Sequence, residues 1–344
     1  MMKICLVCAP GGHLTEMMRL NDAFAQHDVF LITYKEEFLN LPSNIRKVYF
    51  IKNILVNRVQ ANRVEKTLLI ILQMLLLTVK GFKILLIEKP NIVISTGSEI
   101  AIPICYIAKI FGKKVIFIES LCRIDDLSVT GKIVNPISDM FLVQWESLLG
   151  KNKKAQYQGN VLTANVSSDL NNKSNEKSFI FVMVGTAPFQ RLVEKMDKIA
   201  KTLEEKVIMQ IGRTNYRPKN TEYFDFVDYE KIRELNKNAK VVISHAGVGS
   251  IMTALEERAP LILVPRLKKY GEHNDDHQLE IAKMLKKQGL AEVVYDVEEL
   301  SYILSSFNER SLQKSQDIKN QKCLSKYLKI FLSKNFERKA DGVV

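Results

Sequence analysis

The chain has 344 residues and a formal net charge of +12, from 50 Lys and Arg against 38 Asp and Glu. Its content of 47% hydrophobic and 26% charged residues excludes a disordered chain and one embedded wholly in a membrane. The length exceeds what one hydrophobic core supports, so two domains are predicted, and the positive charge favours an anionic partner such as a phospholipid surface, nucleic acid or a phosphorylated substrate.

The first half of the chain alternates short apolar runs with helical patterns. The run at 4–9 is followed by Pro10-Gly11-Gly12-His13 and by a helical pattern from about 15 to 25. Three more apolar runs each stop at a polar loop: 29–33, 92–94 and 115–118. Continuous apolar runs of this length predict the strands of a parallel sheet buried on both faces.

An apolar segment at 67–79 is interrupted only by Gln73. It is short for a bilayer crossing, which needs roughly 20 apolar residues. Three interpretations stay open, namely a buried core helix, a helix lying in one leaflet, and a transmembrane helix. Basic residues that would suit anionic lipid flank the segment on both sides: Arg58, Arg63, Lys66, Lys80 and Lys83.

The second half repeats the same plan after a polar linker at 167–177. Apolar runs at 179–184, 207–211, 241–243 and 261–264 end at these loops: Gly185-Thr186, Gly212, Ser244 to Gly247, and Pro265-Arg266. We therefore predict two α/β domains with Rossmann-like parallel sheets, at 1–166 and 178–330, and a tail at 331–344. A Lys-rich helical pattern runs from Ser301 onward.

The loops after the predicted strands carry the candidate chemistry, because ligands of parallel sheets collect there. Gly11 and Gly12 let backbone N–H groups approach an anion at a helix N-terminus, although a plain strand-to-helix turn would look the same. His13 beside them could accept a proton from a sugar hydroxyl. Ser95-Thr96-Gly97 closes a later strand, and Glu119 and Arg123 close another, either as site residues or as a solvated ion pair.

The stretch from His245 to Ser250 is the most distinctive one in the chain. Met252 and the lack of an acidic ribose partner exclude a dinucleotide fingerprint, and the missing Gly-Lys-Ser/Thr excludes a P-loop. Its glycines still bring amides to a helix N-terminus that would hold phosphate. The polar loop from Gly271 to Gln278 could bind a metal or cap a helix, but no Asp-x-Asp occurs in the chain, which disfavours a metal-held diphosphate.

Together these motifs resemble a two-subunit glycosyltransferase group that includes bacterial exopolysaccharide and capsule transferases. The eukaryotic enzyme that adds the second N-acetylglucosamine to dolichyl diphosphate belongs to the same group. The second half resembles the donor-binding subunit and the first half the membrane-recruiting subunit, so the chain resembles both subunits fused. The resemblance implies a GT-B fold and inverting transfer, without metal or cofactor, from a UDP-sugar to a polyprenyl-diphosphate-linked sugar. It also implies a peripheral position on the cytoplasmic face of the membrane.

The resemblance assigns roles residue by residue. His13 is favoured as the general base, with Glu119 as the rival. The expected acceptor site comprises Gly11, Gly12, Thr15, Glu16, Ser95, Thr96, Gly97 and Arg123. The expected donor site comprises Gly185, Thr186, Gly212, His245, Ala246, Gly247, Gly249, Ser250, Arg266, Glu272, His273, Asp275, Asp276, His277 and Gln278. Thr253 stands where a distant relative has a ribose-binding glutamate, which puts that contact in doubt.

Two other functions remain as alternatives. A UDP-N-acetylglucosamine 2-epimerase would use the same pair of domains without lipid, and a non-catalytic membrane scaffold would recruit a separate transferase. Nucleic-acid binding lacks a basic stripe interleaved with aromatic residues and is not expected. Cys5 and Cys8 form a C-x-x-C, but it reads as a buried strand and no second ligand pair follows, so neither a disulfide scaffold nor a zinc site is expected. The short N-terminal apolar stretch is no signal peptide, so a cytoplasmic location is predicted. Homo-oligomerisation stays open.

Overall fold

The computed structural model describes residues 1–36, 41–55, 63–163, 179–273, 276–307 and 323–340. The chain divides into two compact units, Met1–Ala164 with Lys322–Val344, and Asn165–Gln321. The predicted division at 166/178 lies next to this boundary, and the linker at 167–177 is outside the described residues. The prediction that the second domain runs to 330 and is followed by a tail differs from the structure. The last helix packs on the first unit instead.

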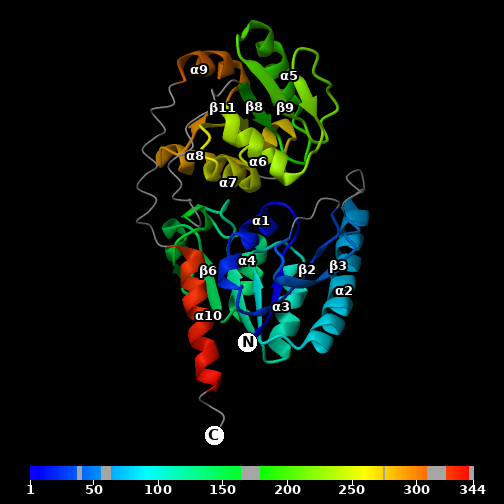
Figure 1. The fold of residues 1–344 in the computed structure, drawn as a ribbon. Coiled ribbons are helices and arrows are strands. Elements are labelled where there is room, and N and C mark those ends of the chain that lie inside the picture. The colour runs from blue at the N-terminus through cyan, green and yellow to red at the C-terminus, as the bar shows by residue number, and fades with distance from the viewer. Residues whose placement is uncertain (37–40, 56–62, 164–178, 274–275, 308–322, 341–344) are drawn as a thin grey trace. The chain divides into compact units, whose positions relative to one another are not determined.

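The first unit is built on a seven-stranded sheet in the order β3-β2-β1-β4-β5-β6-β7 (Figure 1). Every pair of neighbours is parallel, as the continuous apolar runs predicted. The order reverses between β1 and β4, which is where such sheets bind ligands. The strands are β1 (Lys3–Val7), β2 (Asp28–Tyr34), β3 (Ile45–Ile51), β4 (Ile92–Ser95), β5 (Lys114–Ile118), β6 (Met140–Val143) and β7 (Ala155–Tyr157).

Helices of the first unit follow the strands. They are α1 (Gly12–Met18), α2 (Arg63–Glu88), α3 (Ala101–Ile110) and α4 (Val129–Val134). The predicted helix at about 15–25 is shorter than expected, because α1 ends at Met18 and a separate 3₁₀ turn follows at Asn21–Ala23. Met17, Leu20 and Phe24 are nevertheless fully buried. The apolar periodicity therefore predicted the buried positions correctly, although the helix ends at Met18.

The last helix, α10 (Leu324–Ala340), belongs to the first unit although it follows the second in sequence. Leu324, Leu328 and Leu332 form one buried stripe at a spacing of four residues, with none of their side-chain surface exposed. Cys323 forms a parallel bridge with Asn160, which ties the start of the helix to the end of the first unit's sheet region. The red helix in Figure 1 lies along that unit.

The second unit contains a six-stranded sheet in the order β10-β9-β8-β11-β12-β13, again parallel throughout. Its strands are β8 (Phe179–Met183), β9 (Lys206–Gln210), β10 (Glu222–Phe224), β11 (Ala239–Ser244), β12 (Leu261–Leu263) and β13 (Glu292–Val293). Its helices are α5 (Gln190–Ile199), α6 (Tyr229–Asn238), α7 (Val248–Glu256), α8 (His277–Lys287) and α9 (Leu300–Ser306). β8 and β11 lie at the centre, where the order reverses.

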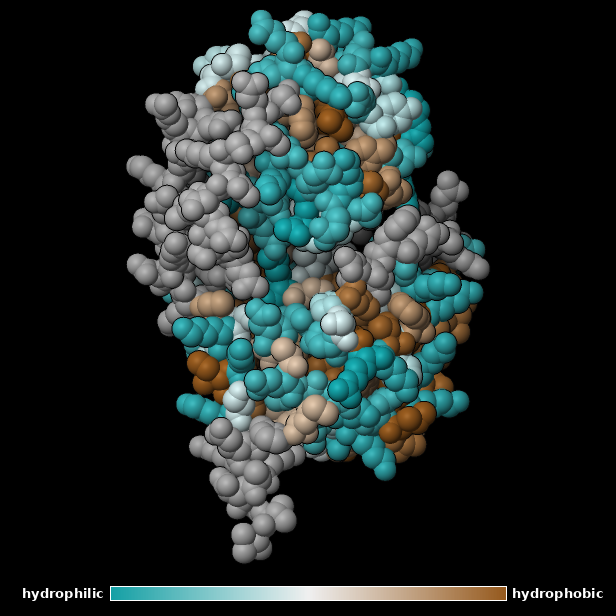
Figure 2. Space-filling model, in the orientation of Figure 1, coloured by the Kyte–Doolittle hydropathy of each residue, from teal (hydrophilic) through white to brown (hydrophobic). Residues whose placement is uncertain are grey.

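Helix α2 is longer than the apolar segment at 67–79 indicated. Among the described residues, Thr67–Glu88 is the one helix long and apolar enough to cross a bilayer, and 28% of its apolar window is buried in the protein. Figure 2 shows hydrophobic side chains gathered on the visible surface around this helix. The exposed members of the α2 surface are Val64, Leu68, Ile70, Ile71, Leu72, Leu75, Val79, Phe82, Leu86 and Ile87.

Gln73, the polar interruption of that segment, faces inward. Its side chain is fully buried, its amide nitrogen donates to the Lys52 carbonyl at 3.3 Å, and its amide oxygen accepts from the Ile54 N–H at 2.9 Å. Leu77 and Leu85 pack in the core beside it. One face of α2 is therefore attached to the sheet, and the opposite face is the apolar one that solvent reaches, so the interpretation as a wholly buried core helix is wrong.

Candidate active site

Three loops of the first unit meet at one edge of its sheet, because β1, β4 and β5 are neighbours and run in parallel. The glycine turn and α1 follow β1, the stretch 96–100 follows β4, and the stretch 119–128 follows β5. The residues predicted to bind the acceptor lie on these three segments, except Ser95, which is the last residue of β4. The topology thus places together side chains that are up to about a hundred residues apart in sequence.

His13 is held from two sides by the loop after β4. Its Nδ1 lies 2.8 Å from the Thr96 carbonyl oxygen, and the Thr96 hydroxyl donates to the His13 carbonyl at 2.7 Å. Gly97 has φ of +116°, and a Cβ there would lie 3.1 Å from the ring carbon Cε1 of His13. A side chain at position 97 would therefore both strain the backbone and press on the ring.

The contact with Thr96 determines the tautomer of His13. A carbonyl oxygen can only accept, so Nδ1 carries the hydrogen and Nε2 keeps its lone pair. Burial lowers the pKa of His13 below its usual 6.5, and the positive charge of Arg123 lowers it further, while the Thr96 carbonyl and Glu99 oppose both effects. His13 is therefore a neutral ring near pH 7, with its basic nitrogen ready to take a proton.

Glu16 lies three residues further along α1 and is buried, with 1% of its surface exposed. Its Oε1 accepts from the Ser120 hydroxyl at 2.8 Å, and its Oε2 accepts from the Leu121 N–H at 3.1 Å and from the Gln144 amide at 2.7 Å. Burial raises its pKa to about 8 despite these hydrogen bonds. Glu16 thus joins α1 to the loop after β5 and to the end of β6, a position that places it beneath the acceptor loops rather than on their surface.

Glu119, the rival base, is also buried, with 1% exposed. Its Oε1 accepts from the Ser120 N–H at 3.0 Å and its Oε2 from the Ser128 N–H at 2.9 Å, next to the N-terminus of α4. Burial raises its pKa. The carboxylate is occupied by backbone amides and is neither a solvated ion pair nor open to a substrate, so the geometry favours His13 as the base.

The remaining acceptor-side residues lie close by. Gly11 is exposed with φ of +79°, Gly12 begins α1, and the Thr15 hydroxyl donates back to the Gly11 carbonyl at 3.1 Å. Ser95 is fully buried and its hydroxyl accepts from the Gly97 N–H at 3.0 Å. Arg123 is half-buried and acts electrostatically on both His13 and Glu119.

Two residues of this edge had no assigned role from the sequence. Glu99 follows the Ser95-Thr96-Gly97 motif and is half-buried near His13, and Gln144 at the end of β6 bonds Glu16, the Glu119 carbonyl and the Val161 N–H. The position of Glu99, an acidic residue just after a glycine loop, was a signal in the sequence that could have identified it. Gln144 had no such signal, because only the sheet order brings β6 next to β5.

The donor side begins with the loop after β8. Gly185 is bound through both backbone groups by the Gln210 side chain, whose Oε1 accepts from its N–H at 2.8 Å and whose Nε2 donates to its carbonyl at 2.9 Å. Gly212 lies against the same carbonyl, and Thr186 is exposed beside it. Gln210, at the end of β9, was not predicted, and its position across the sheet explains why.

His245 follows β11 and is buried, with 7% of its surface exposed. Its Nδ1 lies 3.3 Å from the Met183 carbonyl oxygen, and a Cβ on Gly247 would come within 2.1 Å of its Nε2. Burial and the neighbouring Arg266 charge lower its pKa to about 3, so the ring stays neutral. Gly247 is therefore required by close packing, and His245 supports the loop from beneath.

Helix α7 starts directly after this loop. Ala246 has a φ of +62° and Gly247 is the N-cap, with no side chain capping the first turn. The amides of Val248, Gly249 and Ser250 are thus at the positive end of a helix, where an anion would satisfy them. Thr253 is 5% exposed and its hydroxyl donates to the Gly249 carbonyl at 3.0 Å, so it does not stand ready for a ribose.

Arg266 is the most deeply buried charged group of this edge, with 3% exposed. Its Nη2 donates to the carbonyls of Val184 and Ala187, both at 2.6 Å, and its pKa falls to about 10 because of burial. Its Nε is buried without a hydrogen-bond partner among the described residues. The Gln278 side chain accepts from the Arg266 N–H at 3.0 Å. Arg266 therefore brings a positive charge beneath the glycine loop and retains an unused donor.

A second arginine, which the sequence reasoning missed, holds the polar loop. Arg191 on α5 donates from Nε and Nη2 to the two carboxylate oxygens of Glu272, at 2.7 and 2.9 Å. The guanidinium groups of Arg191 and Arg266 both lie over the Phe189 ring, 5.3 and 5.1 Å from its centre. Both carboxylate oxygens of Glu272 thus take part in a bidentate ion pair with Arg191.

The other predicted donor residues are spread along the start of α8. The His273 and His277 rings meet edge to face at 4.5 Å, and Asp276 accepts from the Lys268 N–H at 2.8 Å instead of capping the helix. Asp275 lies outside the described residues. Within the part of the chain that the structure describes, no group of three or more His, Cys, Asp or Glu side chains is arranged to hold a metal ion.

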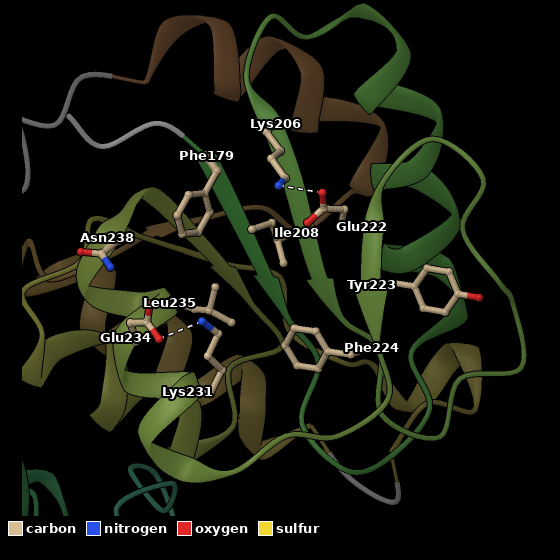
Figure 3. Close-up of a pocket in the computed structure, with 10 residues that line it drawn as sticks. All are labelled: Phe179, Lys206, Ile208, Glu222, Tyr223, Phe224, Lys231, Glu234, Leu235 and Asn238. Atoms are coloured by element: carbon tan, nitrogen blue, oxygen red, sulfur yellow. Dashed lines mark hydrogen bonds and ion pairs between the residues drawn. The ribbon is translucent and has the colours of Figure 1, made fainter. Parts of the chain in front are cut away.

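A groove of about 470 Å³ lies elsewhere on the second unit (Figure 3). It is formed by the amino ends of β8, β9 and β10 together with α6, and its rim carries the ion pairs Lys206–Glu222 and Lys231–Glu234. The glycine loops follow the carboxyl ends of the strands. The groove therefore lies away from the predicted donor site and takes no part in it.

Comparisons with known protein families match both halves of the chain. Residues 179–330 match the model of the glycosyltransferase family 28 C-terminal domain, and residues 4–161 match the model described as oligosaccharide biosynthesis protein Alg14 like. The human UDP-N-acetylglucosamine transferase subunit ALG14 is 31% identical over 183 residues, which is 47% of this chain and 83% of that protein. Human subunit ALG13 is 36% identical over 121 residues, 32% of this chain and 10% of that protein.

Solved structures show the same fold at low sequence identity. MurG of Acinetobacter baumannii superposes with a TM-score of 0.64 at 15% identity, covering 96% of this chain and 99% of the other. MnaA of S. aureus, solved with UDP, has a TM-score of 0.68 at 12% identity and covers 99% and 97%. These likenesses confirm the predicted GT-B fold of two parallel-sheet α/β domains.

Proposed function

The chain belongs to the glycosyltransferase family of the ALG14 and ALG13 subunits, with counterparts of both in one polypeptide, and we propose that it transfers a sugar from a UDP-sugar to a polyprenyl-diphosphate-linked sugar. The two relatives are named as subunits of a UDP-N-acetylglucosamine transferase, which makes UDP-N-acetylglucosamine the first donor to test.

The geometry of His13 carries the proposal. Its Nδ1–H is bound to the Thr96 carbonyl, its pKa is lowered so that the ring is neutral, and no hydrogen bond occupies Nε2 among the described residues. A neutral imidazole with a fixed tautomer and an available ring nitrogen is what a general base requires. The exposed Gly11 turn and the start of α1 lie directly before it, where backbone amides would meet the acceptor's diphosphate.

The proposed reaction is a single displacement. The acceptor hydroxyl attacks the anomeric carbon of the donor while His13 Nε2 takes the hydroxyl proton. The bond between that carbon and the diphosphate oxygen breaks, and UDP leaves with the bonding electrons. One base and no covalent intermediate give inversion at the anomeric carbon. Glu119 does not enter the step, because backbone amides occupy its carboxylate.

Charge that develops on departing UDP needs positive groups, and the second unit supplies two kinds. The first turn of α7 offers uncapped amides from Val248 to Ser250, and Arg266 brings a guanidinium with a buried Nε donor. Preorganised donors of this kind stabilise an anionic leaving group strongly in a site that excludes water. We therefore propose that transfer proceeds without a divalent metal, an arrangement to be tested with a chelator.

The lipid-linked acceptor calls for a position at the membrane, and α2 suits that role. The buried side chain of Gln73 attaches one face of the helix to Lys52 and Ile54 in the segment after β3, while the opposite face exposes the α2 surface. A helix attached along its length to a folded domain would lie in one leaflet rather than cross the bilayer. We propose a peripheral location on the cytoplasmic face, with anionic lipid attracted by Lys80 and Lys83 and by the net positive charge.

Membrane binding has its own test with a matched control. Ile71→Glu with Leu75→Glu places two charges on the α2 surface, where both side chains are exposed, and we expect the variant to stop floating with vesicles containing anionic lipid. Tyr302→Glu changes an even more exposed aromatic residue on α9 of the second unit and should leave flotation unchanged. Retained flotation of the folded α2 variant would remove this helix as the anchor.

The function itself is tested by radiolabel transfer from a panel of UDP-sugars into the organic-extractable lipid fraction, with purified protein, host membranes and EDTA. Label in lipid from UDP-N-acetylglucosamine is the expected result. Label that stays water-soluble in an altered UDP-sugar, formed without any acceptor, would establish the epimerase instead. If the protein does not bind UDP, the non-catalytic membrane scaffold is the one remaining alternative function. Transfer that stops with EDTA and returns with a divalent metal would overturn the metal-independent mechanism.

A further inference from the structure

A carboxylate with no assigned role lies on the loop that surrounds His13. Glu99 is half-buried and follows Thr96 and Gly97, the two residues in contact with the imidazole. Its Oε1 accepts from the Tyr34 hydroxyl at 2.9 Å, and its Oε2 accepts from the Ser98 hydroxyl. Both oxygens are therefore fixed in position, and the loop that holds the ring also holds the negative charge.

The supports of Glu99 come from three elements. Tyr34 stands at the end of β2, and its hydroxyl in turn lies 3.5 Å from the Gln73 amide nitrogen on α2. Ser98 adopts φ of +70°, a left-handed conformation that serine rarely takes and that turns the chain toward α3. Helix α3 begins at Ala101, two residues after Glu99, and its positive end favours a carboxylate at this place.

We propose that Glu99 is a positioning residue for the transfer reaction, the counter-charge that stabilises the imidazolium formed when His13 takes the acceptor's proton. The inference rests on the proposed function, since it assigns a partner to its base. Glu99 acts through His13 and need not touch the substrate. Its negative charge matters most after the proton has moved, when the ring is positive, so it lowers the energy of the transition state more than that of the ground state.

The charges around the ring support this assignment. Glu99 raises the pKa of His13 and Arg123 lowers it, so these two groups oppose each other at the imidazole. Glu16 and Glu119, the two other buried acidic groups of this edge, bind other donors. Glu16 receives the Ser120 hydroxyl, the Leu121 amide and the Gln144 side chain, and Glu119 receives the amides of Ser120 and Ser128. Of these three, Glu99 is the one that lies on the loop whose residues Thr96 and Gly97 contact the His13 ring.

The test measures the pKa of His13 directly by NMR titration of the imidazole signals, which is practical because the chain has five histidines. His13→Ala assigns the signal. Glu99→Gln should lower the pKa of His13 by roughly half a unit to one unit, and Glu99→Asp should restore most of it. Tyr34→Phe, which removes one support of the carboxylate, should cause a smaller shift in the same direction. Glu146→Gln, an exposed carboxylate of the same unit, is the matched control and should cause none.

Transfer kinetics provide the second readout. In Glu99→Gln the acid limb of the kcat/KM profile should move to lower pH with His13, and kcat should fall by about threefold to tenfold while UDP affinity is unchanged. An unshifted His13 pKa in folded Glu99→Gln, or a shift equal to that of Glu146→Gln, overturns the inference even if activity is lost. Wild-type protein that transfers no sugar would refute the proposed function, whereas the NMR titration would still report on Glu99.

Discussion

Each unit places a histidine beside glycines at the carboxyl end of a central parallel strand, and the two histidines differ in what their second nitrogen can do. Both rings turn Nδ1 toward a backbone carbonyl, Thr96 for His13 and Met183 for His245. His13 is half-buried and keeps Nε2 available. The Nε2 of His245 instead packs so closely on Gly247 that a Cβ on that residue would lie 2.1 Å from it. The same residue type next to the same kind of loop thus fits the proposed base in one unit and packs against a glycine in the other.

The neighbours of each ring explain the difference. Around His13 the charged groups are of both signs, Glu99 and Arg123, so that the ring can change its charge during a reaction. Around His245 the Arg266 charge and the burial both oppose protonation. The proposed proton-transfer site therefore has charges of both signs beside its histidine, whereas the proposed anion site has a positive charge beside its histidine.

The largest expected effect comes from His13→Ala. Turnover should fall by about a hundredfold or more because the general base is lost, while the affinity for UDP, measured by titration calorimetry, stays as in the wild type. His245→Ala should do the reverse, weakening UDP binding through the loosened loop before α7. Equal loss of turnover and UDP affinity in both variants would contradict the division of roles between the two histidines.

Arg266→Met should cause the next largest effect. It leaves the carbonyls of Val184 and Ala187 without their donor, so we expect the free energy of unfolding to drop by about 2–4 kcal/mol, together with weaker UDP binding. Chemical denaturation measures the first and calorimetry the second. Arg217→Met removes an exposed arginine of the same unit, paired with Asp225, and serves as the control with little change. Wild-type stability in Arg266→Met would mean that these carbonyls find other donors.

A pH series sharpens the electrostatic comparison. Burial raises the pKa of Glu16 from 4.5 to about 8, so between these values the folded chain keeps a proton that the unfolded chain releases. The contribution of Glu16 to stability is therefore lost as the pH rises toward about 8. The pKa of His245 falls from 6.5 to about 3, so its contribution is lost as the pH falls below 6.5.

Difference measurements isolate these two contributions. The free energy of unfolding of the wild type minus that of Glu16→Gln should decrease from pH 5 to pH 8, and the corresponding difference for His245→Asn should decrease from pH 7 to pH 4. Denaturant titrations at each pH provide the values. A flat difference for Glu16→Gln would show that its carboxyl is ionised in the folded protein, contrary to its burial.

Local patterns in the sequence determined much of this protein. Continuous apolar runs such as 4–9 and 179–184 indicate strands buried on both faces, and the glycine turns that follow them predict ligand loops. The fold class, the place of His13 and the glycine loop at 245–250 followed from that. These features depend on residues adjacent in the chain, so periodicity and turn chemistry suffice to find them.

Only the tertiary structure decided which side chains act on one another. The order of strands places Gln144 beneath Glu16, Gln210 on Gly185 and Tyr34 on Glu99, pairs that are between 25 and 128 residues apart. It also shows that Glu119 is occupied by backbone amides and that α10 returns to the first unit. Burial and hydrogen-bond partners arise from packing between distant segments, and no local pattern encodes them.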